Sequence, residues 1–153
     1  MSAKSLVIIV GLVVAACGQG TEDSMPPQPT VYAQMSFGER AAFMTEVVLP
    51  RMTETFAAFD PKYANMSCTT CHGKGATDGT YAMPSPQIPP LPSSEEAFFE
   101  YMKDPEHARW SQFMIGEVWP KMASLLNLEK FDPTSHLDGF SCSNCHTLMG
   151  APH

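Results

Sequence analysis

The residues best suited to chemistry in this 153-residue chain form two copies of one pentapeptide pattern. Cys68–His72 reads Cys-Thr-Thr-Cys-His, and Cys142–His146 reads Cys-Ser-Asn-Cys-His. Two thiols separated by two residues can each bond one vinyl group of a haem, and the adjacent imidazole can then bind the iron. The sequence therefore predicts two covalently bound haem c groups. Their expected protein ligands are Cys68, Cys71 and His72 for the first haem, and Cys142, Cys145 and His146 for the second.

Two interpretations without haem explain these cysteines less well. The four thiols could build a zinc ribbon or form two disulfides. The gap of about 70 residues between the pairs is far longer than the usual zinc spacing of about 15–20 residues. Neither alternative accounts for a histidine directly after both pairs.

Each iron also needs a sixth ligand for electron transfer, or an open position for small-molecule chemistry. For the first haem the sequence offers Met52 and Met83. For the second haem the candidates are Met122, Met114, His136, His107, Met149 and His153. A methionine in a helical stripe also serves as ordinary core packing.

The segments upstream of the two motifs repeat each other as well. Phe43–Thr55 aligns without gaps with Phe113–Leu125, and this alignment pairs Met52 with Met122. An Asp-Pro turn follows each segment, at Asp60 and at Asp132. We therefore interpret residues 35–153 as one di-haem domain made of a duplicated unit of helix, turn and haem motif. Repeat one covers about residues 36–80, and repeat two covers about residues 106–150.

This arrangement resembles the multihaem cytochrome c subunit of bacterial photosynthetic reaction centres. In that family, a methionine on a helix just upstream supplies the sixth ligand, and a turn leads to the C-x-x-C-H motif. The resemblance implies Met52 and Met122 as sixth ligands, with Met83 and His136 as the alternatives. The family subunit has four such units and this chain has two, so it resembles half of that subunit.

The hydrophobic pattern predicts a mostly α fold with much loop and little or no sheet. Apolar residues at helical spacing predict a helix in each repeat, and Ser36–Glu39 has the spacing of a capping box for the first. Pro50 and Pro120 lie inside these helices, where proline is expected to bend or divide them. In the connection, residues 81–105, five prolines between residues 81 and 92 predict an extended wrap over the surface or over a haem edge. A short helix is expected over residues 94–103, capped by Ser93.

The N-terminal segment reads as an export signal. Residues 1–16 contain Lys4 and then eleven apolar residues, which is too short for a membrane-spanning helix. The run ends in two alanines and Cys17, which resembles the lipobox of bacterial lipoproteins. The resemblance implies cleavage before Cys17, lipidation of its thiol, and residues 17–34 as a flexible tether. We expect a protein anchored in the bacterial envelope and facing the periplasm, with the outer membrane slightly favoured.

The net charge restricts the classes of partner that the protein is expected to have. The net charge of −7 and the lack of a basic stripe argue against a nucleic-acid partner. We expect an electron carrier that exchanges single electrons with redox proteins, that is not an enzyme, and that has a membrane electron-transfer complex among its candidate partners. The alternative is a haem enzyme, either a di-haem peroxidase or a small-molecule reductase, with one five-coordinate haem.

Overall fold

The computed structural model describes residues 32–149. The expected signal peptide, Cys17 and residues 17–31 of the expected tether lie outside this range, as does His153. The last three residues of the expected tether, Tyr32–Gln34, form a 3-10 turn, and the Tyr32 ring lies 6.1 Å from the Phe43 ring. This contact places the end of the expected tether against the first helix.

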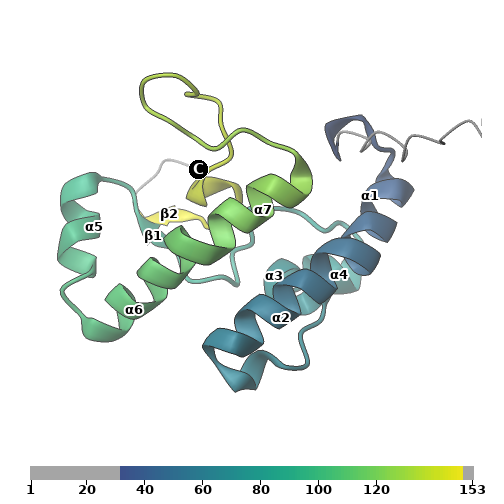
Figure 1. The fold of residues 1–153 in the computed structure, drawn as a ribbon, viewed down its shortest axis with the longest axis horizontal. Coiled ribbons are helices and arrows are strands. Elements are labelled where there is room, and N and C mark those ends of the chain that lie inside the picture. Colours follow the sequence, from purple (N-terminus) through teal and green to yellow (C-terminus); the bar gives the residue numbers. More distant parts are fainter. Residues whose placement is uncertain (1–31, 150–153) are drawn as a thin grey trace, which may run out of the picture.

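Two long helices form the frame of the molecule (Figure 1). The first consists of α1 (Phe37–Phe43), a π-helical turn η2 (Met44–Val48) and α2 (Leu49–Phe59). The second consists of α6 (Pro105–Phe113), a π-helical turn η4 (Met114–Val118) and α7 (Trp119–Leu126). The same order of elements therefore occurs in both segments that align in the sequence.

The π turns accommodate the two internal prolines. Pro50 and Pro120 have no N–H, and their rings would collide with the carbonyl four residues earlier in a regular α-helix. The helix widens instead: the N–H of Leu49 donates to the carbonyl of Met44, and that of Trp119 donates to the carbonyl of Met114, each five residues earlier. The prolines thus widen the helices without dividing them.

Side-chain caps fix where three helices begin. The capping box at Ser36 is confirmed, because its N–H donates to Glu39 Oε2 at 2.7 Å and its hydroxyl accepts from the Glu39 N–H. The prediction of Ser93 as a cap is wrong: α5 (Glu95–Tyr101) is capped by Ser94, whose hydroxyl accepts from the Ala97 N–H. Ser94 has the extended backbone angles of a cap residue, φ −123° and ψ 154°, so the helix begins after it. Glu95 and Glu96 lie in its first turn, where the helix dipole favours negative charge. Asp104 caps α6 in the same way.

The core lies where the two long helices pack on each other. Its buried cluster joins Val48, Met52 and Phe56 of the first helix to Phe113 of the second. Phe59 stacks on Phe113 with ring centroids 4.0 Å apart, and Phe56 meets Phe113 edge-on at 5.1 Å. These aromatic contacts hold the two repeats together through apolar burial.

The remaining elements are short. In chain order they are η3 (Pro61–Tyr63), α3 (Cys68–His72), α4 (Gly75–Asp78), β1 (Leu91–Pro92), η5 (Cys142–Asn144) and β2 (Leu148–Met149). β1 and β2 pair in parallel, with Leu91 opposite Leu148. The mostly α prediction is confirmed, since this pair is the one sheet within residues 32–149. None of the helices in that range has the length and apolar character needed to cross a membrane.

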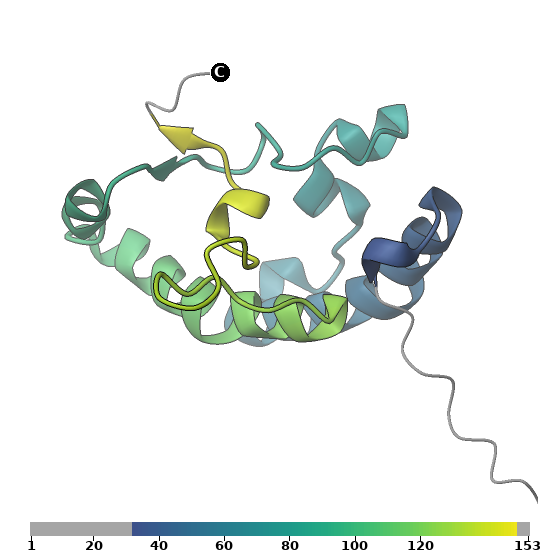
Figure 2. The same cartoon turned by 90° about the horizontal axis from the view of Figure 1, so that it is seen from above.

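The two cysteine motifs lie on one side of the helical frame. Figure 2 shows α3 and η5 next to the extended segment that connects α4 to β1, whereas the long helices run along the opposite side of the molecule. We call this segment, residues 81–92, the strap. It is not extended throughout, because the Ile88 N–H donates to the Ser85 carbonyl at 3.2 Å and closes a turn, and it passes both motifs.

Candidate functional site

Both C-x-x-C-H motifs fold into a single tight turn. The N–H of Ser67 donates to Thr70 Oγ1 at 3.1 Å, and the N–H of Ser141 donates to Asn144 Oδ1 at 2.7 Å, so both turns are closed in the same way. Residues three apart lie on one face of such a turn. The two thiols of each motif therefore share a face, and the histidine follows directly.

The thiols are free, and all but the exposed Cys142 are partly buried. Cys68, Cys71, Cys142 and Cys145 are all unbridged. Burial raises the pKa of the Cys71 thiol and raises that of Cys145 to about 11, to which the neighbouring Cys71 also contributes. At neutral pH these thiols carry their protons. The influence of Cys71 on Cys145 also indicates that the two motifs are neighbours in space.

Each motif histidine uses Nδ1 to hold a backbone carbonyl of the strap. His72 Nδ1 lies 3.1 Å from the Tyr81 carbonyl oxygen, and His146 Nδ1 lies 2.9 Å from the Pro89 carbonyl oxygen. A carbonyl oxygen can only accept, so Nδ1 must carry the hydrogen. In a neutral ring Nε2 then keeps its lone pair, which is the form that binds a metal.

The surroundings of His72 favour that neutral form. Partial burial lowers the pKa of His72, and the hydrogen bond to the Tyr81 carbonyl opposes part of this effect. The Tyr81 ring also meets the His72 ring edge-on, with centroids 5.5 Å apart. Ring orientation and tautomer are therefore both set by one residue of the strap.

The sequence did not predict that the strap supplies both acceptor carbonyls. The available signal was its proline content: Pro84, Pro86, Pro89, Pro90 and Pro92 lack an N–H, so the segment offers more acceptors than donors. Which carbonyl meets which histidine depends on contacts between residues up to 57 positions apart. No local pattern encodes such a contact.

The two expected methionine ligands lie in or against the helical core. Met52 is only 4% exposed and belongs to the buried cluster, against which Met66, two residues before Cys68, also packs. Met122 is half-buried against the same cluster. It lies one turn after Trp119, whose indole N–H donates to the Phe140 carbonyl at 2.6 Å, two residues before Cys142. The helix that carries each methionine therefore contacts the segment that leads into the C-x-x-C-H motif of the same repeat.

The other candidates occupy different places. Met83 is half-buried in the strap itself, and Met114 packs against the core cluster. His136 is exposed on the loop after α7, where its backbone pairs with Asp132. His107 is exposed and stacks on Tyr101 with ring centroids 3.9 Å apart, and Met149 is exposed in β2.

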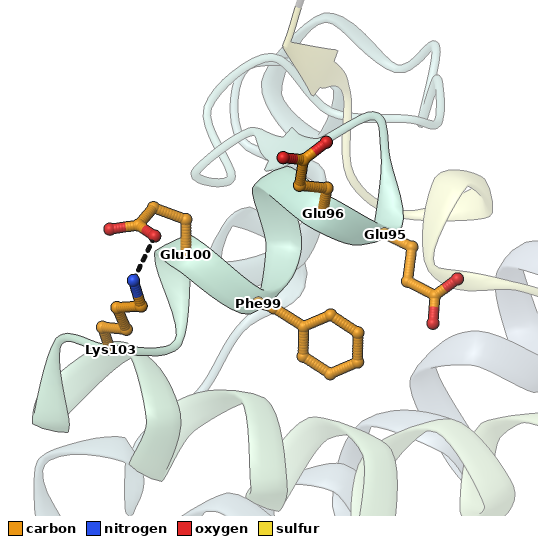
Figure 3. A pocket seen from close by; sticks show the side chains of 5 residues that line it. All are labelled: Glu95, Glu96, Phe99, Glu100 and Lys103. Atoms are coloured by element: carbon orange, nitrogen blue, oxygen red, sulfur yellow. Dashed lines mark ion pairs between the residues drawn. The ribbon is translucent and has the colours of Figure 1, made fainter.

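The described residues contain no second kind of metal site. No group of three or more His, Cys, Asp or Glu side chains in residues 32–149 is arranged to hold a metal ion. A surface pocket lies on α5, where Glu95, Glu96 and Phe99 line it together with an ion pair between Glu100 and Lys103 (Figure 3). Its lining contains no cysteine, histidine or methionine.

Comparisons with protein-family models, with curated proteins and with solved structures each found no match to this chain.

Proposed function

We propose that this protein is a di-haem c-type cytochrome that transfers single electrons. The observation that carries the proposal is the arrangement of each motif: two thiols on one face of a single turn, followed by a histidine whose Nδ1 is bound to a carbonyl. This donor set fits covalent haem, because the free Nε2 can bind iron while the thiols bind the porphyrin edge. The bound haem would supply a reversible one-electron couple.

Attachment of the haem needs no atoms other than those of the thiols and the vinyl groups. Each thiol would add its sulfur to one vinyl carbon and its hydrogen to the other, which forms a thioether without a net oxidant or reductant. The cysteines are free of disulfides, which this addition requires. The cysteines would then hold the porphyrin in place while His72 and His146 each provide one axial ligand.

Shared local structure supports the interpretation of a duplicated cytochrome unit. Both long helices contain a π turn before their proline, and both motif turns are closed by the residue before the second cysteine. After the first helix Asp60 accepts from the Lys62 N–H, and after the second Asp132 accepts from the Thr134 N–H. Three paired features in the same order favour a repeat.

The layout favours Met52 and Met122 as sixth ligands. In an imidazole ring Nδ1 and Nε2 point in different directions, so the strap that binds Nδ1 lies behind each histidine as seen from the iron. A sixth ligand must come from the other side of the porphyrin, and the long helices lie opposite the strap (Figure 2). Met83 belongs to the strap, and His136 is exposed, so both suit the role less well.

The small number of buried apolar side chains is consistent with the binding of large cofactors. Within residues 32–149 six apolar side chains are buried, namely Val48, Met52, Phe56, Phe113, Ala123 and Leu126. Two porphyrins would add much apolar surface to such a core, and burial of that surface stabilises the fold. The same apolar surroundings, with methionine ligation, would raise the reduction potential.

The envelope location is part of the proposal. Lipidated Cys17 would anchor the protein to a membrane facing the periplasm, where haem attachment to C-x-x-C-H takes place, and its partners would be redox proteins. Metabolic labelling with palmitate tests this anchor. We expect label in the wild type and none in Cys17→Ser, which should move to the soluble envelope fraction.

The central experiment is expression with haem-maturation machinery, followed by a pyridine haemochrome assay and an optical spectrum. We expect two covalent haems with low-spin spectra. Cys68→Ala/Cys71→Ala and Cys142→Ala/Cys145→Ala should each lose one haem, and Ser67→Ala serves as a control that leaves the thiols intact. Absence of covalent haem would refute the proposal. A high-spin haem that binds carbon monoxide in the native protein would instead favour the haem enzyme.

A further inference from the structure

The strap contacts the two motifs in turn along its length. Hydrogen bonds join it to both motifs and to the residues that follow them, and in chain order the strap residues are Tyr81, Ser85, Gln87, Pro89 and Leu91. Tyr81 and Gln87 bind the first motif and the residues directly after it, whereas the other three bind the second motif. A single segment of twelve residues thus holds both iron-binding histidines.

On the second motif, the backbone of the strap makes contact at two separate points. The N–H of Ser85 donates to the Cys145 carbonyl at 3.2 Å, and the N–H of Leu91 donates to the Thr147 carbonyl at 2.9 Å. These bonds flank His146 on both sides. Ser85 is fully buried at this contact, with 0% of its surface exposed. The strap and the second motif should therefore move as one body.

On the first motif, the backbone of Tyr81 and the side chain of Gln87 form the attachment. The N–H of Tyr81 donates to the Gly75 carbonyl at 2.9 Å, and the Tyr81 carbonyl accepts from His72 Nδ1. Gln87 Oε1 accepts from the Lys74 N–H, two residues after His72. The amide group reaches this N–H by passing over Gly73, where a Cβ atom would lie 1.6 Å from Oε1. Gly73 has φ +54°, a conformation that glycine adopts at little cost. The residue after His72 is thus shaped to receive Gln87.

We propose that Gln87 is a positioning residue for His72, acting through the strap, whose Tyr81 carbonyl accepts from His72 Nδ1. The backbone bonds at Ser85 and Leu91 hold the strap at His146 without Gln87. This inference rests on the proposed function, in which His72 and His146 bind haem iron. Donation from Nδ1 makes an imidazole a stronger ligand and fixes its orientation. A stronger imidazole ligand stabilises ferric iron, so loss of the Gln87 bond should raise the potential of the first haem and leave that of the second unchanged.

The test compares Gln87→Ala with two reference variants in the haem-loaded protein. Gln112→Ala is the matched control, because Gln112 is exposed on α6. Gln87→Glu keeps an acceptor oxygen for the Lys74 N–H, and its added negative charge would lower the potentials. In Gln87→Ala alone we expect an upward shift of one midpoint potential in an optical redox titration, namely the one that is absent from Cys68→Ala/Cys71→Ala. An equal shift at both haems, a shift at neither haem, or the same shift in Gln112→Ala would overturn the inference.

A second measurement separates this inference from the proposed function. If the haemochrome assay finds no covalent haem, the proposed function fails, and the strap is judged by the histidine tautomers of the purified protein. Long-range ¹H–¹⁵N NMR should then show Nδ1–H at His72 and His146 in the wild type, and a loss of this preference at His72 but not at His146 in Gln87→Ala. Retention of the tautomer at His72, or its loss at both histidines, would overturn the role of Gln87.

Discussion

At the scale of single residues, Tyr81 is the most constrained member of the site. Its φ of +48° lies in the left-handed region, which is uncommon for a residue with a bulky side chain. In this conformation its carbonyl reaches His72 Nδ1 while its ring meets the His72 ring edge-on. Such local strain is found where the surrounding structure needs a particular orientation. Here that orientation is the one that leaves Nε2 of His72 free.

The sixth ligand of the second haem can be tested with Met122→Ala. Loss of the thioether should convert this haem to high spin or lower its midpoint potential, because a methionine ligand raises the potential. Haem attachment should stay intact, since Cys142 and Cys145 are unchanged. An optical spectrum with a redox titration measures both effects.

The matched control for this variant is Met114→Ala, since Met114 packs against the same cluster. Both variants lose apolar packing, at most about 2–5 kcal/mol for a fully buried methionine. Only Met122→Ala should change the haem spectrum. If the spectrum and potential of Met122→Ala match the wild type, another residue binds the iron.

At the scale of secondary-structure elements, the π turns decide how each long helix presents its side chains. A π turn contains one residue more than an α turn, so the side chains after it are rotated about the helix axis. Met52 and Met122 both follow such a turn by a few residues. Their shared place relative to the core depends on this rotation, which a regular α-helical pattern does not give.

Gly116 lies inside the second π turn and offers a test of its stability. A Cβ atom there would meet nothing within 4 Å. Gly116→Ala should therefore raise the free energy of unfolding by about 0.5–1 kcal/mol, because alanine loses less backbone entropy on folding. Urea unfolding monitored by circular dichroism measures this difference. A destabilised variant would mean that the π turn itself requires glycine.

Gly139→Ala is the contrasting variant for that experiment. Its Cβ atom would lie 2.4 Å from the backbone nitrogen of Phe131. Because backbone atoms cannot yield as a flexible side chain can, the loop would have to shift. We expect this variant to unfold at a lower urea concentration than the wild type.

The loop after α7 depends on Asp132. Its carboxylate accepts from the hydroxyl and N–H of Thr134 and from the N–H of Ser135, and these bonds lower the pKa of Asp132 to about 2. A lowered pKa stabilises the fold above the unfolded value of about 3.9, and this stabilisation is lost as the pH falls through about 2. Asp132→Asn should therefore reduce the loss of stability between pH 4 and pH 2.

Urea unfolding at several pH values between 2 and 6 measures this difference. Asp138→Asn removes a carboxylate from the same exposed loop and is the matched control. The expected result is a smaller pH dependence for Asp132→Asn than for the wild type or the control. Identical slopes in all three proteins would show that Asp132 does not hold the loop through its charge.

At the scale of the whole molecule, two helices packed through an aromatic core support the motif turns on one side. The chain has 16 acidic and 9 basic side chains, and haem propionates would add further negative charge. A field of this sign attracts cations and repels anions over about one Debye length. The protein should therefore exchange electrons most readily with basic partners.

Small redox probes of opposite charge test this field. Reduction of the oxidised protein by hexaammineruthenium(II) should slow as ionic strength rises, because salt screens the attraction. Oxidation of the reduced protein by ferricyanide should accelerate, because salt screens the repulsion. Stopped-flow absorbance measures both rates. Rates that respond to salt in the same direction would argue against steering by the net charge.

The sequence by itself determined the parts of this protein that depend on nearby residues. Motif spacing identified the two cysteine pairs and their histidines, apolar periodicity predicted the long helices, and the spacing from Ser36 to Glu39 predicted a cap that is confirmed. The sequence pattern did not decide between two neighbouring serines that could both cap a helix. The structure shows that Ser94 is the cap, because its hydroxyl accepts from the Ala97 N–H.

Only the tertiary structure decided how these parts meet. The strap carbonyls that orient both histidines, the attachment of Gln87 across Gly73, and the π turns that set the direction of Met52 and Met122 all depend on packing. The physical reason is that a hydrogen bond between distant residues depends on where the whole chain places its donor and acceptor. Residue type and spacing define which atoms can bind iron. The fold defines which nitrogen of each histidine carries the hydrogen and which one keeps the lone pair that can bind iron.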